Sequence, residues 1–350
     1  MSLVLIISLL AGCAGTPVVY YTNCTCPVDA HTVVKTPDET YVPAEGALKT
    51  GLYISTSVKD SKAATADAEG DANYVVNIAA VLVDDNGVIR SCIVDSIGTS
   101  VKFDAAGAIT TDLNAVPLSK AEKGEAYGMK ASGSKYEWNE QVNALAEYAV
   151  GKTVEELKNG AVNESGKAKD ADLASVASIY LGGHVNDIVK AVENAKHLGA
   201  QTGDTLKMAA IPGIGDSTNA NAEKDGNAQL NVDVTALTMN GEVITSCYLD
   251  SVQAKIAFDT SGAIKTADLN APVPTKNELG ENYGMVAWGT AKAEWNVQAE
   301  SFAKYVTGKT PADVAGIHVD ETTKPTDADL SASVTIKIGG FQNLIAKAAR

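Results

Sequence analysis

The residue types that most often do chemistry are sparse in this sequence. Gly151-Lys152-Thr153 has the residues of a phosphate-binding loop, but that loop needs another glycine five positions earlier, where Ala146 stands. We therefore expect Gly151 to end one helix and Thr153 to begin the next. No nucleophile is matched with a base, as a hydrolase or transferase would require. We expect a carrier or binding protein without its own catalytic site.

Cysteine and histidine could build metal or redox sites, but their positions argue against both. The two similar halves of the chain, set out below, share no histidine position, which excludes a duplicated histidine site. Cys92 and Cys247 do correspond, within apolar strand patterns, and we expect buried thiols that are not bonded to each other. Cys24 and Cys26 form a C-x-C pair without further ligands nearby. We expect these two thiols to be oxidised to a disulfide, within the pair or between chains, and binding of a soft metal ion is the alternative.

The composition limits the class of function. The chain has 350 residues, 45% of them hydrophobic, and a net charge of −15. This length fits about two domains, and the apolar content is sufficient for each to bury a core. Because an acidic chain repels nucleic-acid phosphates, we expect no nucleic-acid partner.

The N-terminus has the features of an export signal. Residues 3–11 are almost wholly apolar but too few to span a bilayer, which is typical of a signal peptide. Leu10-Ala11-Gly12-Cys13 resembles the bacterial lipobox, which implies that residues 1–12 are removed and that Cys13 carries a lipid. The protein would then be extracytoplasmic and lipid-anchored to the cell membrane, with the proline-containing residues 13–48 as a tether. The alternative is a buried N-terminal strand with an ordinary cysteine.

An internal repeat is the strongest signal in the sequence. Ser91-Cys92-Ile93-Val94-Asp95 recurs as Ser246-Cys247-Tyr248-Leu249-Asp250, and further matches follow in the same order. These are Tyr127-Gly128-Met129 with Tyr283-Gly284-Met285, Glu137-Trp138-Asn139 with Glu294-Trp295-Asn296, and Asp170-Ala171-Asp172-Leu173 with Asp327-Ala328-Asp329-Leu330. The sequence therefore predicts two homologous domains, at residues 49–196 and 200–350.

Each copy is predicted to be an α+β domain in which helices pack on an antiparallel β-meander. Pairs of apolar runs flank Asn-Gly turns and indicate hairpins. The runs are 74–83 with 88–95, and 230–239 with 242–250.

Helical patterns follow the hairpin in each copy. Amphipathic helices start near Trp138 and Trp295, with both tryptophans in the core and a capping box of Ser134 and Glu137 before the first. Thr153 and Thr310 begin shorter helices. Each copy then closes with a β-branched run, two glycines and a last helix. The β-branched runs are 176–181 and 334–338.

The hairpin, the Ser-Cys-x-x-Asp strand, Tyr-Gly-Met, Glu-Trp-Asn and Asp-Ala-Asp-Leu together resemble Gram-positive surface lipoproteins with the FMN-binding domain. The resemblance covers both repeats, about residues 49–350. It implies that a separate flavin transferase attaches FMN, through its phosphate, to a Ser or Thr hydroxyl downstream of an aspartate. By position, the resemblance places the aspartate and the acceptor hydroxyl at Asp170 and Ser178 in the first repeat, and at Asp327 and Thr335 in the second. Matched loop residues are further candidates for ligand contact, namely Tyr127, Met129, Tyr283 and Met285.

The runs before Ser178 and Thr335 lack the glycine of the family motif, which lets a phosphate approach the backbone. Two functions follow as alternatives. The first is a carrier of flavin, covalent or noncovalent, that serves redox partners in electron transfer outside the cell. The second is a noncatalytic surface module, structural or binding a small ligand, that has lost flavin binding.

Overall fold

The computed structural model describes residues 46–289 and 291–350. The predicted signal peptide (1–12), the lipid site at Cys13, the pair of Cys24 and Cys26, and nearly all of the predicted tether lie outside these residues. Among the described residues, no helix combines the length and the apolar character needed to cross a membrane.

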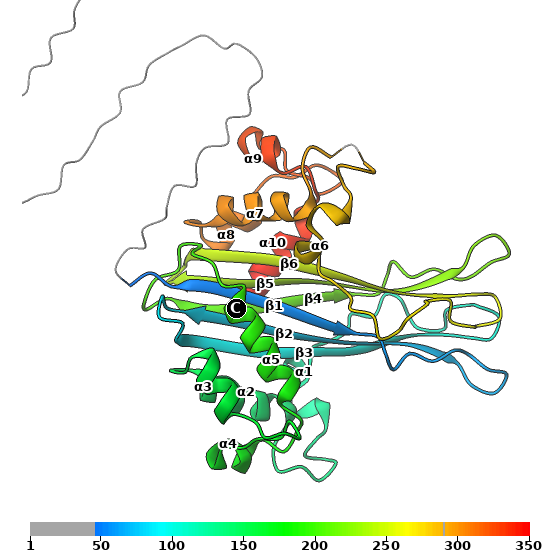
Figure 1. Cartoon of the computed structure of the whole chain (residues 1–350). Helices are drawn as coiled ribbons and strands as arrows, with labels where there is room; N and C mark the ends of the chain where they lie inside the picture. Colours follow the sequence, from blue (N-terminus) through cyan, green and yellow to red (C-terminus); the bar gives the residue numbers. More distant parts are fainter. Residues whose placement is uncertain (1–45, 290) are drawn as a thin grey trace, which may run out of the picture. The chain divides into compact units, whose positions relative to one another are not determined.

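Each repeat forms a three-stranded antiparallel sheet whose strands are adjacent in chain order (Figure 1). The first sheet consists of β1 (Lys49–Ser57), β2 (Gly70–Val83) and β3 (Ile89–Phe103). The second consists of β4 (Thr205–Gly213), β5 (Gly226–Asn240) and β6 (Val243–Phe258). The predicted class, α+β with antiparallel sheets and helices, is confirmed.

The predicted hairpins form, and a turn side chain helps to explain why. Between β2 and β3, Asp84 accepts hydrogen bonds from the N–H groups of Asn86 and Val88, both at 2.9 Å. Gly87 completes this turn with a φ of 77°, which glycine adopts without a steric penalty. The hairpin strands extend beyond the predicted runs, and the sequence pattern does not predict the edge strands β1 and β4.

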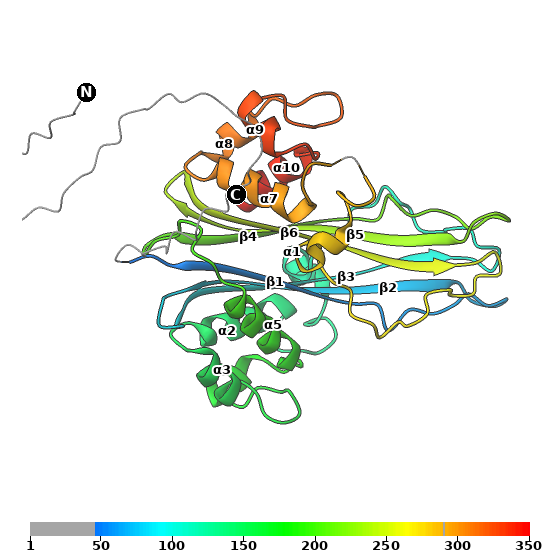
Figure 2. The same ribbon diagram turned by 45° about the horizontal axis from the view of Figure 1, so that its top comes forward.

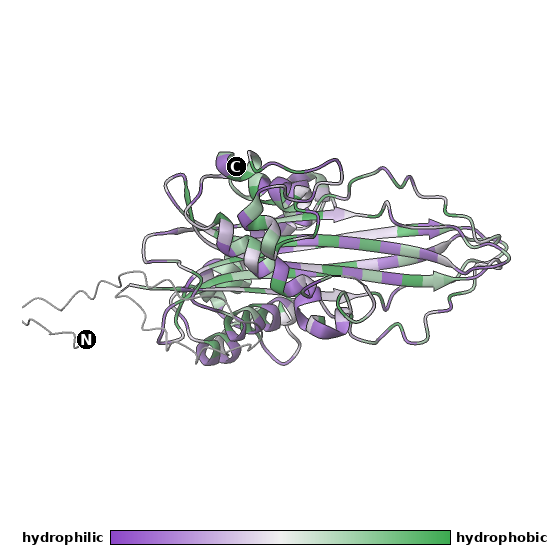
Figure 3. Ribbon diagram, turned by 90° about the horizontal axis from the view of Figure 1, so that it is seen from above, coloured by the Kyte–Doolittle hydropathy of each residue, from purple (hydrophilic) through white to green (hydrophobic). Residues whose placement is uncertain are grey.

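Equivalent residues of the two repeats meet in one shared core between the sheets. The rings of Phe103 and Phe258 stack with centroids 4.1 Å apart and an interplanar angle of 8°. The Tyr74 hydroxyl donates to the Ala228 carbonyl at 2.8 Å, across the same interface. Figure 3 shows alternating hydrophobic and hydrophilic bands along the strands, as expected where one face is buried; in β2 burial alternates at first and is continuous from Ile78 to Val83. The described residues of both repeats belong to one compact unit, so the repeats in sequence are not separate compact units.

Helices cover the outer face of each sheet (Figure 1, Figure 2). The long helices are α2 (Trp138–Ala149) and α5 (Gly182–Glu193) on the first sheet, and α7 (Trp295–Val306) and α10 (Gly339–Ala348) on the second. The shorter helices are α1 (Lys120–Lys123), η1 (Gly124–Tyr127), α3 (Val154–Gly160), α4 (Ala171–Val176), α6 (Lys276–Leu279), η2 (Gly280–Tyr283), α8 (Pro311–Ala315) and α9 (Ala328–Ser333).

Several predictions for these outer layers are confirmed. Trp138 and Trp295 are buried at the first positions of α2 and α7. Cys92 and Cys247 are free cysteines; Cys247 is buried and Cys92 is partly buried, and loss of hydration raises the pKa of each thiol to about 12. Gly151 has a φ of 83° after α2. Capping boxes begin α3 and α8 as predicted.

The predicted capping box of Ser134 and Glu137 is wrong. Glu137 is itself the N-cap of α2, and its N–H donates to the Glu140 carboxylate at 2.7 Å. The Ser134 hydroxyl instead donates to the Tyr136 carbonyl at 2.8 Å. The capping box is therefore shifted by one turn.

The β-branched runs 176–181 and 334–338 are not strands, contrary to their pattern. Val176 ends α4, and the following backbone is irregular. A side chain takes the place of a neighbouring strand, because Gln141 Oε1 accepts the N–H groups of Ser178 at 2.7 Å and Ile179 at 3.1 Å. The second repeat does the same with Gln298, as described below.

Candidate ligand-binding site

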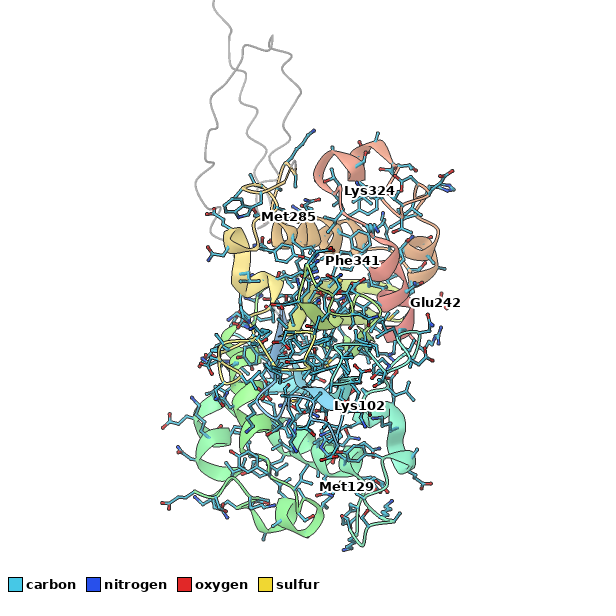
Figure 4. All side chains as sticks on the ribbon, turned by 90° about the vertical axis from the view of Figure 1, so that its right-hand side faces the viewer. Lys102, Met129, Glu242, Met285, Lys324 and Phe341 are labelled. Atoms are coloured by element: carbon cyan, nitrogen blue, oxygen red, sulfur yellow. The ribbon has the colours of Figure 1, made fainter. Side chains whose placement is uncertain are left out.

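One cavity of the second repeat brings together several predicted site residues. It has a volume of about 580 Å³, within the range of roughly 300–1,000 Å³ that is common for ligand pockets. Figure 4 labels Met285, Lys324 and Phe341 at this end of the molecule. The lining residues are Asp233, Lys276, Tyr283, Met285, Trp295, Thr323, Lys324, Thr335, Ile336, Lys337, Gly340 and Phe341.

A larger cavity of about 690 Å³ lies beside Gly46 and the turn after β2. Its acidic side chains already have partners, because Asp84 pairs with Arg90 at 2.6 Å and Asp85 with Lys49 at 2.9 Å. None of the predicted site residues lines it among the described part of the chain. The cavity of the second repeat is therefore the better candidate.

Three lysines give the candidate cavity a positive charge. Lys276 lies between two rings, with Nζ 5.3 Å from the centroid of Tyr283 and 4.9 Å from that of Trp295. Burial lowers the pKa of Lys276, against the opposing effect of the Asp233 carboxylate. Lys324 and Lys337 are exposed at the cavity. With Asp233 as the one lining carboxylate among the described residues, the cavity has an excess of positive charge in a chain of net charge −15.

Thr335 is held at the cavity by a glutamine that the sequence analysis did not single out. Gln298 Oε1 accepts the Thr335 N–H at 2.7 Å, the Thr335 hydroxyl at 3.1 Å and the Ile336 N–H at 3.2 Å. Gln298 is buried, and its amide nitrogen donates to the Ala293 carbonyl at 2.7 Å. The match of Gln141 with Gln298, two residues after each Trp-Asn pair, is the signal that could have identified this role.

Asp327 and Asp170 have a local structural role. Each is the N-cap of a short helix, and Asp327 Oδ1 accepts the N–H groups of Asp329 and Leu330, both at 3.1 Å. Among the described residues, Asp327 does not line the cavity that contains Thr335. The structure therefore brings Thr335, Tyr283 and Met285 to one cavity and leaves Asp327 outside its lining.

The Tyr-Gly-Met loop is fixed by the N-cap of the next helix. In the second repeat, the N–H groups of Met285 and Val286 donate to the two carboxylate oxygens of buried Glu294, at 2.8 and 2.9 Å. Gly284 has a φ of 82° at the bend, which brings its neighbours Tyr283 and Met285 to the cavity wall. The first repeat shares this arrangement, with Met129 and Lys130 donating to Glu137.

The corresponding region of the first repeat has different side chains. The Tyr180 ring packs against Gly166 and Gly182, where a Cβ would collide with it. Lys167 Nζ donates to the Ser178 carbonyl at 2.7 Å. The second repeat has Thr323 in place of Gly166 and Lys337 in place of Tyr180, whereas Lys324 matches Lys167. The two predicted sites are therefore not equivalent.

The side chains of the cavity fit a phosphate better than its backbone does. The N–H groups of Thr335 and Ile336 are already used by Gln298, so they are not available to cradle a phosphate. The Thr335 hydroxyl also donates its proton to Gln298, so the lysine ammonium groups remain as the phosphate contacts. The residues present thus fit an anion that is held by side chains.

Comparisons of the chain with protein-family models, with curated proteins and with solved structures gave no match.

Proposed function

We propose that this chain is a lipid-anchored, extracytoplasmic binding protein whose second repeat holds a flat, phosphorylated ligand noncovalently. FMN is the first candidate, because the sequence resembles proteins with the FMN-binding domain. The observation that carries the proposal is a cavity lined by three lysines, one of which, Lys276, lies beside the rings of Tyr283 and Trp295.

Each part of such a ligand has a counterpart in the cavity. Lys324 and Lys337 would neutralise the phosphate by charge-assisted hydrogen bonds. Lys276, already placed over two rings, would add positive charge deeper in the cavity. A bound flavin would supply reversible electron transfer, and the acidic chain would disfavour its anionic reduced form. Redox partners outside the cell would then use the protein as an electron carrier.

A second candidate function is a structural surface module that has lost flavin binding. Two observations favour it: Gln298 accepts the backbone N–H groups of Thr335 and Ile336, and in the first repeat the Tyr180 ring lies over Gly166 and Gly182. This module would leave the lysine cavity without a ligand.

Titration of the purified, full-length protein with FMN separates the two functions. We expect saturable binding that weakens as salt is added, because the phosphate is held by exposed ammonium groups. Lys337→Gln should weaken binding about 10-fold, corresponding to about 1.4 kcal/mol for one charge-assisted contact. Lys304→Gln, which removes an exposed lysine of α7 outside the cavity lining, should change the affinity less than 2-fold, on the order of 0.4 kcal/mol.

Two other outcomes would change the conclusion. A colourless protein that gains neither bound FMN nor thermal stability from it supports the structural module. Yellow colour that survives denaturation and is lost in Thr335→Ala establishes covalent attachment at Thr335 instead of noncovalent binding.

A further inference from the structure

Trp288 is the most exposed of the large hydrophobic residues in the described part of the chain. Its exposed fraction is 92%, whereas Trp138 and Trp295 are 4% and 6% exposed. Tryptophan has a large apolar surface, and leaving it in water forgoes a considerable gain from burial. An ordered loop that presents this side chain to solvent therefore suggests a contact that forms on binding.

The loop places Trp288 beside the lysine cavity. The backbone N–H of Trp288 donates to the Gly284 carbonyl at 3.0 Å. The edge of the indole ring lies against Gly284, where a Cβ would collide with it. Gly284 separates Tyr283 from Met285, and both of these line the cavity. The edge of the exposed indole thus touches the backbone between two lining residues, although Trp288 is not itself among the lining side chains.

The first repeat offers an internal comparison. Its equivalent loop has the same backbone bond, from the Ser132 N–H to the Gly128 carbonyl at 3.1 Å, and the same anchoring to a glutamate. Serine stands there in place of Trp288, in the repeat whose Tyr180 packs over Gly166. The loop conformation thus does not need tryptophan, and the exposed indole accompanies only the open cavity.

We infer that Trp288 stacks on the planar ring of the ligand that the lysine cavity holds, and so selects phosphorylated heteroaromatic compounds over other phosphates. This inference rests on the proposed function. The ammonium groups of Lys324 and Lys337 recognise any phosphate, including that of a sugar or of glycerol. The indole face recognises only a flat π-system, as aromatic side chains do when they stack on bases. Trp288 is a specificity-determining residue in this account.

The test compares three ligands on the full-length protein and its variants. The ligands are FMN, riboflavin, which lacks the phosphate, and glycerol 3-phosphate, which lacks the ring. We expect Trp288→Ser, which installs the residue of the first repeat, to weaken FMN and riboflavin binding about 10-fold, as loss of one stacking contact does. Glycerol 3-phosphate binding should be unchanged. Trp288→Phe should recover most of the FMN affinity, because it keeps an aromatic face.

Flavin fluorescence adds a readout that a purely structural role of Trp288 would not change. Stacking on indole quenches isoalloxazine emission, so FMN bound to the wild type should be dim and FMN bound to Trp288→Ser brighter. Equal affinity and equal brightness in wild type and Trp288→Ser would overturn the inference while leaving the proposed function intact. Loss of glycerol 3-phosphate binding in Trp288→Ser would also overturn it, since the effect would then not be confined to the ring. If wild type binds none of the three ligands, the proposed function fails and the inference fails with it.

Discussion

Thr323 holds a backbone conformation that its side chain disfavours. Its φ is 66°, and it is the one non-glycine residue with positive φ among the described residues. The first repeat has Gly166 at this position, with a φ of 71°. Thr323 lines the lysine cavity, so local strain in the second repeat coincides with the candidate site.

Thr323→Gly is expected to increase the free energy of unfolding by about 0.5–1 kcal/mol. Relief of the left-handed conformation contributes roughly 1–2 kcal/mol, and the greater freedom of glycine in the unfolded chain offsets about half of it. Denaturant titration measures the change. The reverse substitution, Gly166→Thr, should destabilise, because its Cβ would meet the Tyr180 ring. Destabilisation by Thr323→Gly would show that the conformation at Thr323 is not strained.

A buried polar pair distinguishes the first repeat from the second. His184 and Asp187 occupy the positions of Phe341 and Leu344, and their Nδ1 and Oδ2 atoms are 3.9 Å apart. Neither of these two atoms makes a hydrogen bond. Burial raises the pKa of Asp187 to about 6, and burial together with the Lys120 charge lowers the pKa of His184 to about 4.

Asp187→Asn should stabilise the protein at pH 8 but hardly at pH 4. Because the pKa of Asp187 is raised by folding, the protonated form favours the folded state, and this contribution is lost as the pH rises through 6. The shift corresponds to about 3 kcal/mol, which is the expected upper bound of the gain at pH 8. Unfolding free energies at pH 4 and pH 8 test this. A gain of the same size at both values would exclude ionisation of Asp187 as its cause.

At the scale of elements, the sequence predicted the helices and turns that depend only on neighbouring residues. The hairpin turns and the helices that begin at Trp138 and Trp295 follow from turn residues and apolar periodicity. The edge strand β4 was missed because it contains Pro212, which lacks an N–H and is tolerated only at an edge. The β-branched runs do not form strands, because Gln141 and Gln298, distant in sequence, satisfy their backbone N–H groups.

Gln298→Ala tests the role of this glutamine in holding the 335–336 segment. Removing the acceptor leaves two N–H groups and a hydroxyl without their partner, so we expect a loss of about 2–4 kcal/mol in unfolding free energy. Hydrogen exchange should show faster exchange at the amides of Thr335 and Ile336. Gln298→Glu is the comparison variant: it keeps the acceptor but places a buried carboxylate oxygen against the Ala293 carbonyl, so it should be destabilised while the two amides stay protected. Unchanged exchange at both amides in Gln298→Ala would contradict the assignment.

At the scale of the whole molecule, the two repeats stabilise each other through the core between their sheets. The candidate site also depends on the whole fold, because its lining comes from β5, α6, η2, the loop before α7, α7 itself, the segments on both sides of α9, and α10. The sequence predicted Tyr283, Met285 and Thr335 from matched motifs. It could not predict that Asp233, Lys276 and Lys337 line the same cavity, because these residues are far apart in the sequence and share no motif.

Phe258→Ala should destabilise both repeats together. Removal of the ring that stacks on Phe103 leaves a cavity in the shared core, and we expect a loss of about 3–5 kcal/mol. Hydrogen exchange should accelerate in β2 as well as in β5, because the two strands face the same core. Faster exchange in the second repeat alone would show that the repeats unfold independently.

The central claim is that the lysine cavity of the second repeat holds a ligand, whereas in the first repeat the Tyr180 ring lies over Gly166 and Gly182 of the corresponding region. Isothermal titration calorimetry of FMN into the full-length protein measures this most directly. The account predicts a single class of site with one FMN per chain. Two equivalent sites per chain, or no binding heat and no bound flavin, would contradict it.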